Sequence, residues 1–324
     1  MGAWKYILKK FFQAFLTLLF VLAVNFFLFR VLPGDPAKSV ARSLKLSLED
    51  TQKLRVEFGL DQPVFPNQFV LYVENTVTGN LGTSYITARP VSEAIATRVW
   101  WTLLLVGTST VLATGLGIIV GIKGAWRRGG TFDVGSLGVS LTLYSMPEGW
   151  LGMMLLTFFA VTLHVFPAGQ AQSAPPPAGA IPQFVDILNH LFLPCLTLTL
   201  GYIGEYSIIM RASLLETINE DFVGTARAKG LLDKNVRRHH AVPNALLPIV
   251  TLVVLNFGYI LGGAIVVEYV FSYPGLGAFT VEAINANDFP VIQGVFLLTS
   301  AAVIFANFIA DLLYVYLDPR VREV

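Results

Sequence analysis

The chain has 324 residues, of which 54% are hydrophobic and 13% charged, and its formal net charge is +1. Soluble domains carry about 25% charged residues, so this composition predicts a membrane protein and argues against an ordinary soluble domain. The near-neutral charge gives no support for nucleic-acid binding. The single cysteine, Cys195, excludes an internal disulfide framework.

Six apolar runs are long enough to cross a bilayer, which takes about 20 residues each. They cover 11–32, 101–122, 134–163, 191–210, 247–270 and 291–317. The first is too long for a signal peptide and lacks a small-residue cleavage site, so we expect it to be retained. Pro147 predicts a kink in the third. Gly117 and Gly121 in the second would allow another helix to approach closely. The expected fold class is an all-α polytopic membrane protein with six transmembrane helices.

The segment 33–99, between the first two spans, contains two helical patterns. Ser47 and Asp50 resemble a capping box before a first helix, and Gly59 suits its stop. A second amphipathic stretch covers about 67–77. We expect a small helical outer loop, whose role is either a structural lid or contact with a partner.

The distribution of Lys and Arg predicts the orientation, because cytoplasmic loops are enriched in them. Basic residues precede the first span, follow the last, and occupy the loops between spans two and three and between spans four and five. The loops 164–190 and 271–290 contain none. We therefore expect both termini in the cytoplasm. The resulting regions are 1–32, the outer loop 33–99, a five-helix core 100–317 with a cytoplasmic loop 211–243, and a tail 318–324.

The polar stretch 216–243 is the most informative part of the sequence. Ile218, Phe222 and Ala226 fall on one helical stripe. Gly230 is a natural helix stop, so a cytosolic helix is expected over about 216–230. Asp233 can cap a second short helix that Pro243 would end. The first helix either rests on lipid headgroups or is seated in a groove of a soluble subunit.

The sequence lacks the usual catalytic and nucleotide-binding motifs. It has no Gly-x-x-x-x-Gly-Lys phosphate loop, no His-Glu-x-x-His and no Gly-x-Ser-x-Gly. The adjacent His239 and His240 would not share a helix face, which argues against a metal pair. We therefore predict neither a catalytic residue, nor a metal site, nor a cofactor in this chain.

Two acidic residues lie within predicted spans. Glu148 follows Pro147 near the middle of the third span, and Glu205 lies in the fourth. An acidic residue at mid-membrane costs about 2.5–3.5 kcal/mol on insertion scales. Either each carboxyl has a structural partner or is protonated, or the two line a pathway and favour a substrate with positive charge.

The loop Phe271–Gly277 combines aromatic residues with Pro274 and two glycines and has no charge. Phe271, Tyr273, Pro274 and Gly275 would suit an outer gate or a contact with an external binding protein. The alternative is a simple hairpin between spans five and six.

Several motifs in order resemble those of the permease subunits of ABC importers, in the dipeptide and oligopeptide branch. Together they extend over nearly the whole chain. They are Leu32-Pro33-Gly34-Asp35-Pro36-Ala37, Gly59-Leu60-Asp61-Gln62-Pro63, Gly79-Asn80-Leu81-Gly82-Thr83-Ser84, Arg89-Pro90-Val91-Ser92, Phe166-Pro167-Ala168-Gly169, Phe271-Ser272-Tyr273-Pro274-Gly275-Leu276-Gly277 and Leu317-Asp318-Pro319-Arg320.

The resemblance extends to the coupling signature of these permeases. Gly230 and Pro243 fall on its Gly and Pro, and Ala226 keeps its second Ala. Gly224 stands where general ABC permeases have Glu, a departure that the peptide branch often shares. The polar contact with an ATPase is left open among Glu220, Asp221 and Arg227.

The resemblance implies an assembly and a type I importer permease fold. A second, related permease would complete the pathway as a heterodimer, and two separate subunits would bind ATP and Mg. An extracytoplasmic binding protein would deliver the substrate, with peptides favoured. Nickel, an oligosaccharide or another solute is the alternative, and a secondary transporter is a weaker one. The location implied is the plasma (inner) membrane.

Overall fold

The structure, a computed structural model, describes residues 3–31, 47–57, 61–260 and 264–317. The described residues form helices and no strand; one isolated bridge joins Thr83 and Pro90. In chain order the helices are α1 (Ala3–Val31), α3 (Leu48–Glu57), η1 (Val64–Gln68), α4 (Phe69–Val77), α5 (Val91–Trp126), α6 (Thr131–Ser145), α7 (Glu148–Leu155), η2 (Leu156–Thr162), α8 (Ala180–Ile218), α9 (Asp221–Ala228), α10 (Asp233–Val236), η3 (Arg237–Ala241), α11 (Val242–Ala245), α12 (Leu247–Ile260), α13 (Ile265–Val270), α14 (Leu276–Asn285) and α15 (Phe289–Leu317).

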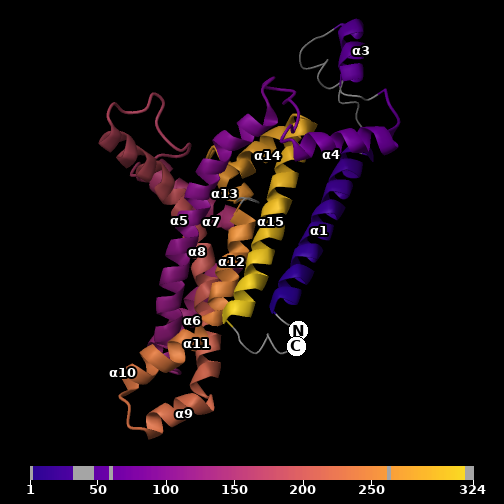
Figure 1. Cartoon of the computed structure of the whole chain (residues 1–324). Helices are drawn as coiled ribbons and strands as arrows, with labels where there is room; N and C mark the ends of the chain where they lie inside the picture. Colours follow the sequence, from indigo (N-terminus) through magenta and orange to yellow (C-terminus); the bar gives the residue numbers. More distant parts are fainter. Residues whose placement is uncertain (1–2, 32–46, 58–60, 261–263, 318–324) are drawn as a thin grey trace.

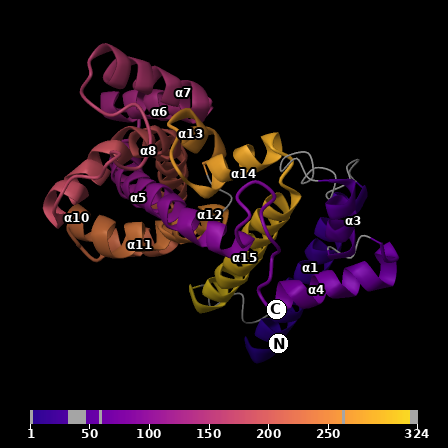
Figure 2. The same cartoon turned by 90° about the horizontal axis from the view of Figure 1, so that it is seen from above.

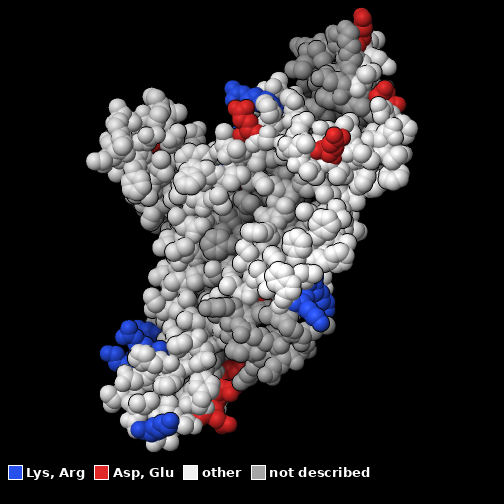
Figure 3. Space-filling model, in the orientation of Figure 1, with Lys and Arg blue, Asp and Glu red and all other residues white. Residues whose placement is uncertain are grey.

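The long helices α1, α5, α8 and α15 run side by side between two ends of the molecule (Figure 1). We call the end that carries α9 and α10 the lower end, and the end that carries α4 and α14 the upper end. Seen from above, α15 lies between α1 and the rest of the bundle (Figure 2). On the face in Figure 3, charged side chains gather towards the two ends and leave an uncharged belt between them. Such a belt suits the hydrocarbon layer of a bilayer.

Four helices of the described chain are long and apolar enough to cross a membrane: Trp4–Phe29, Val91–Trp126, Ala180–Ile218 and Phe289–Leu313. They correspond to the first, second, fourth and sixth predicted spans. A fifth is possible by composition if Asp233–Ala245 and Leu247–Asn256, which meet at 43°, form one bent span. The count of six continuous spans is therefore not confirmed.

The predicted third span, 134–163, is divided at Met146 and Pro147, as the expected kink requires. The α-helix ends at Ser145 and a new one begins at Glu148. Met146 is extended, with φ −78° and ψ 131°, because a residue that precedes proline clashes with the proline ring in the helical conformation. Each part is too short to pass as a span alone.

Close packing of α5 on α8 depends on the two predicted glycines. A Cβ at Gly117 would lie 2.5 Å from the Cβ of Tyr206, and one at Gly121 would lie 2.7 Å from the Cβ of Met210. Contacts this short do not occur between real side chains, so only glycine lets the two backbones approach. The prediction of a tight helix contact at these positions is confirmed.

The segment predicted as the outer loop contains the two expected helices, α3 and α4. α5 begins at Val91, so its first turns fall within the predicted range 33–99; Gly59 lies outside the described residues. Asp288, between α14 and α15, anchors the last part of the loop. It accepts hydrogen bonds from Ser84 Oγ at 2.6 Å and from the backbone N–H of Tyr85 at 3.1 Å.

We predict that Gly117→Ala destabilises the protein while Gly115→Ala does not. The added methyl group at 117 would collide with α8, and overpacking of this kind costs about 1–3 kcal/mol. A Cβ at Gly115 meets nothing within 4 Å, so the control substitution should be neutral or stabilise the helix by up to about 1 kcal/mol. Thermal unfolding of the purified protein measures both; equal unfolding temperatures for the two variants would contradict the packing described.

Candidate functional site

The lower end is built around α9, which is shorter than the predicted helix 216–230. Glu216 and Ile218 belong to the last turn of α8. The chain then turns at Asn219, whose Nδ2 donates to the carbonyl of Leu215 at 2.9 Å. Glu220 is extended and precedes the first residue of α9. Because the polar side chain of Asn219 bonds back to the preceding turn, it competes with continuation of the helix.

The two faces of α9 have opposite environments. Val223 and Ala226 are buried, at 0% and 4% exposure, in a cluster that includes Leu214 of α8 and Val236 of α10. Phe222 is 42% exposed. Ala226, which the resemblance places in the coupling signature, therefore does not present its side chain to a partner, because that side chain packs inside this chain. Phe222 is available on the surface.

Gly230 ends α9 as predicted. Its φ is +78°, a conformation that glycine adopts without the steric cost other residues incur. The N–H of Gly230 donates to the carbonyl of Arg227, and the N–H of Leu231 donates to the carbonyl of Ala226. This pair of bonds is the Schellman arrangement, which satisfies carbonyls that the helix end leaves free. The stop is followed by two exposed apolar side chains, Leu231 and Leu232.

Trp126, at the end of α5, holds the segment after α9 in place. Its Nε1 donates to Asp233 Oδ2 at 2.9 Å, and the guanidinium groups of Arg227 and Arg237 lie 5.8 Å and 5.6 Å from its ring centroid. Arg227 also pairs with Asp233 at 3.6 Å. Of the three residues left open for a polar contact, Arg227 is thus engaged within the chain, whereas Glu220 and Asp221 are exposed. Sequence reasoning missed Trp126.

Pro243 does not end a helix, contrary to the prediction. It lies in the first turn of α11, within a helical path that runs from Asp233 to Ala245. Proline is tolerated there because it lies just after the π-helical segment η3, where the hydrogen-bond pattern of the helix changes. Asp233 does not act as the cap either: the cap position is Leu232, and Asp233 is the first helical residue.

A second polar clamp at the lower end joins α6 to α8. Arg211 donates to Asp133 from Nε at 2.6 Å and from Nη2 at 2.9 Å. The carboxylate also accepts from the backbone N–H of Gly129. The guanidinium holds the pKa of Asp133 down at about 2, so the pair stays ionised at physiological pH. Its stabilising effect is lost only as the pH falls below the usual range of aspartate towards 2.

The two membrane carboxylates lie on one side of α8. Glu148 is the first residue of α7, and a Cβ added at Gly201 of α8 would lie 3.8 Å from Glu148 Oε1. Glu205 follows Gly201 by four residues, on the same helical face. Both side chains are half-buried. Among the described residues, neither carboxylate has a hydrogen-bond or ion-pair partner, which argues against the purely structural interpretation of a paired carboxyl.

The loop Phe271–Gly277 at the upper end is packed into the protein. Phe271 and Tyr273 are 1% and 0% exposed and belong to a core cluster of α5, α8 and α13. The N–H of Gln170 donates to the carbonyl of Phe271, so the predicted motif around Gly169 lies against this loop. The expectation that Tyr273 contacts a binding protein is therefore wrong, because its side chain is inaccessible. Pro274 is half-buried and Gly275 is buried.

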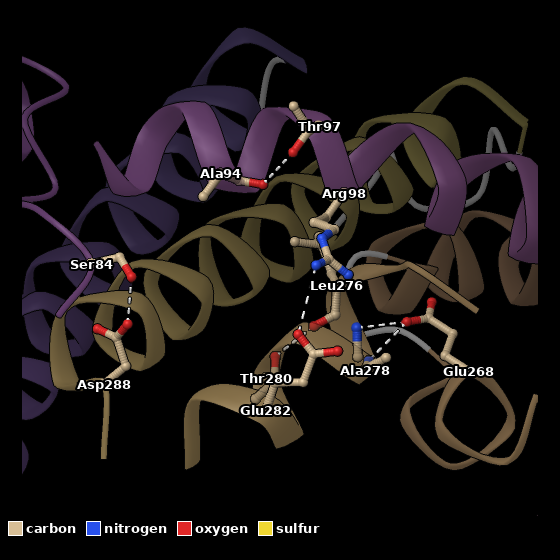
Figure 4. A network of polar contacts seen from close by, with 11 residues as sticks. Ser84, Ala94, Thr97, Arg98, Glu268, Leu276, Ala278, Thr280, Glu282 and Asp288 are labelled. Carbon is tan, nitrogen blue, oxygen red and sulfur yellow. Dashed lines mark hydrogen bonds and ion pairs between the residues drawn. The ribbon is translucent and has the colours of Figure 1, made fainter. Parts of the chain in front are cut away.

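The glycines of this loop leave room for the side chain of Glu268. Sequence reasoning did not identify Glu268. Its carboxylate, 0% exposed, accepts from Thr102 Oγ1 at 2.8 Å and from the N–H groups of Gly277 and Ala278 at 2.7 Å and 3.1 Å. The bonds from the first turn of α14 cap its N-terminus (Figure 4), where an anion is stabilised. A Cβ at Gly275 would collide with the carboxylate.

Comparison with known proteins identifies the family. The model described as "Binding-protein-dependent transport system inner membrane component" matches residues 113–323, and the model for the N-terminal part of such components matches residues 3–106. This chain belongs to that family.

The permease is also similar over nearly its full length to curated proteins. It is 35% identical to the dipeptide transport system permease protein DppB of Escherichia coli (strain K12), covering 98% of this chain and 99% of that protein. It is 37% identical to the glutathione transport system permease protein GsiC of Escherichia coli O6:H1, covering 98% of both. The expected fold class, an all-α polytopic ABC importer permease of type I, is confirmed.

We predict that Glu268→Ala severely destabilises the permease. Three buried donors would lose their acceptor, at a cost of about 1–3 kcal/mol each. Glu268→Gln keeps one carbonyl acceptor and should cost less. The control is Glu282→Ala, because the Glu282 side chain is 58% exposed in its pair with Arg98 and exposed ion pairs contribute little. Unfolding temperatures should rank wild type and Glu282→Ala above Glu268→Gln, and Glu268→Ala lowest; the reverse order for the two alanine variants would refute the capping role.

Proposed function

We propose that the chain is one of two permease subunits of an ATP-driven, binding-protein-dependent importer of peptides. Its relatives over nearly full length are named for dipeptide and glutathione transport, and both solutes are small peptides. Import of nickel or an oligosaccharide by the same class of transporter is the alternative, and uptake measurements with each solute separate them.

The single observation that carries the proposal is the surface of α9. Phe222, Leu231 and Leu232 expose apolar side chains beside the acidic Glu220 and Asp221. Acidic residues are poorly suited to an anionic lipid surface, so a groove in a soluble subunit fits better than headgroups. We assign this surface to an ATP-binding subunit. A secondary transporter would not require such a docking surface.

The orientation follows from this assignment. The lower end, with α9, is cytoplasmic, and both termini lie on the cytoplasmic side. Basic residues support this side, since Lys123, Arg128, Lys229, Lys234 and Arg238 all lie at or near the lower end. Two ATP-binding subunits, which hold ATP and Mg, would then dock below the two permeases.

The remaining partners occupy the other faces. A second, related permease completes the pathway, and the substrate-binding protein delivers its cargo at the upper end. Lipid covers the apolar outside, including α1, whose Phe11, Phe20 and Phe27 are exposed. The permease itself carries no cofactor in this assembly.

Glu148 and Glu205 are assigned to the pathway. Their carboxylates share one side of α8 and have no partner among the described residues. A carboxylate inside the membrane normally pairs with a cation or faces a polar interior. The protonated amino terminus of a peptide, or a basic side chain, supplies such a cation during passage.

We predict that Phe222→Asp uncouples the ATPase. The introduced charge would be buried without a partner when the exposed surface of α9 docks on the ATP-binding subunit. Loss of a hot-spot residue of this kind costs about 2 kcal/mol of binding free energy or more. ATPase activity stimulated by loaded binding protein should fall at least about tenfold in the reconstituted complex. Phe305→Ala, at an exposed position of α15, is the control and should behave as wild type. Full stimulation in Phe222→Asp would contradict the placement of α9 at the interface with the ATP-binding subunit.

We also predict that Glu148→Gln lowers uptake of a cationic peptide more than uptake of a neutral one. The neutral amide keeps the size of the side chain and removes its attraction for positive charge. Glu205→Gln should act in the same direction. The measurement is the ratio of uptake of a lysine-containing dipeptide to that of dialanine in proteoliposomes with all subunits. A ratio equal to wild type in both variants would make the carboxylates structural.

A further inference from the structure

A cavity of about 310 Å³, lined by both polar and apolar residues, lies at the upper end, away from α9 and from the membrane carboxylates. Its walls come from Phe29 of α1, Tyr72 of α4, Gly82 of the segment before α5, and Gln293 of α15. The volume is far larger than a single water requires. The cavity is therefore able to hold a small ligand or a headgroup.

The described part of the lining is rich in amides and carries no charge. Gln68, Asn75, Asn80 and Gln293 contribute amide side chains, and no Asp, Glu, Lys, Arg or His is among the lining residues that the structure describes. An amide offers both donors and an acceptor. Phe29 and Phe289 add apolar ring surface. A phosphate or carboxylate would enter this site without a counter-charge, which makes an ionic ligand unfavourable.

Two of these amides have unused hydrogen-bonding capacity. Gln68 is 6% exposed; its Nε2 donates to the carbonyl of Gln62 at 2.6 Å, while its buried Oε1 has no partner among the described residues. Asn75 accepts from Asn80 Nδ2 at 3.4 Å, and no described residue accepts from its own Nδ2. The buried oxygen of Gln68 is costly to leave without a partner, whereas Asn75 is only half-buried. A ligand that donates to the first and accepts from the second would be stabilised.

The depth of the cavity matches the headgroup layer. Phe289 is the first residue of α15, which is long and apolar enough to cross a membrane. The end of such a span marks the boundary between hydrocarbon and headgroups. Tyr72, held by Asn25 Nδ2 at 3.1 Å, has the amphipathic character typical of this boundary.

We propose that this cavity binds an uncharged, hydroxyl-rich ligand of the glycosyl class. Sugar hydroxyls both donate to and accept from the amides, and the C–H face of a sugar ring packs on the aromatic side chains. The same chemistry is available from a glycolipid headgroup and from a free saccharide. The site is separate from the path assigned to the transported solute, so its occupant acts as a bound ligand of the permease.

The experiment measures lipid retention by native mass spectrometry. The full chain, purified in a polyoxyethylene detergent that has no sugar headgroup, is titrated with digalactosyl diacylglycerol or, for comparison, phosphatidylglycerol. Gln68→Leu and Asn75→Leu remove one amide each. Gln183→Leu, at an exposed position of α8, is the matched control. If Gln68→Leu fails to fold, Asn75→Leu alone decides the result.

The expected result is saturable binding of one galactolipid. Its affinity should fall about tenfold in the two cavity variants, as loss of one hydrogen bond implies, and stay unchanged in Gln183→Leu. Competition by free maltose would support the free-saccharide source, and its absence a lipid-borne headgroup. Equal retention by all variants, or preference for phosphatidylglycerol, would overturn the proposal. Because this assay requires no transport, its outcome is independent of the importer's substrate.

Discussion

The contact between α5 and α8 is the constraint on which the other features depend. Gly117 and Gly121 let the two backbones approach more closely than side chains allow, and dispersion contacts drive such packing within a bilayer. Both ends of the molecule are attached to this pair. At the upper end, Thr102 of α5 bonds the carboxylate that caps α14. At the lower end, α9 follows α8 directly and Trp126 of α5 holds the segment beyond it.

The four acidic residues discussed above fall into two groups that differ in whether the carboxylate has a hydrogen-bond or ion-pair partner. Asp133 has a two-point ion pair with Arg211, and Glu268 accepts three hydrogen bonds. Each fixes one element against another. Glu148 and Glu205 have no comparable partners among the described residues, although they lie in the apolar part of the chain. A buried carboxylate that is fully hydrogen-bonded or ion-paired within the chain has a structural role. A carboxylate without such partners indicates a ligand or another subunit.

The lower end is held together by packed side chains. α9 has only eight residues, too few for a helix to be stable alone in water, so its order depends on burial of Val223 and Ala226 against α8 and α10. The Schellman bonds at Gly230 and the contacts of Trp126 restrict it further. A push on its exposed face therefore reaches α8 through packed side chains rather than through a loose loop. This rigidity suits the coupling role that is proposed for α9.

The sequence by itself determined the class of the protein and the places where its helices stop. Apolar runs located α1, α5, α8 and α15, Pro147 located the break before α7, and Gly230 located the end of α9. Each of these depends on local chemistry: burial of an apolar stretch, the missing N–H of proline, or the conformational freedom of glycine.

Only the tertiary structure decided which side chains are accessible and which groups meet. Ala226 and Tyr273 look like surface residues in a motif, yet both are buried because distant helices cover them. Trp126, Arg211 and Glu268 carry no local signal, since their partners lie 107, 78 and 166 residues away along the chain. A contact between residues so far apart depends on how the helices pack, and periodicity along a single helix does not contain that information.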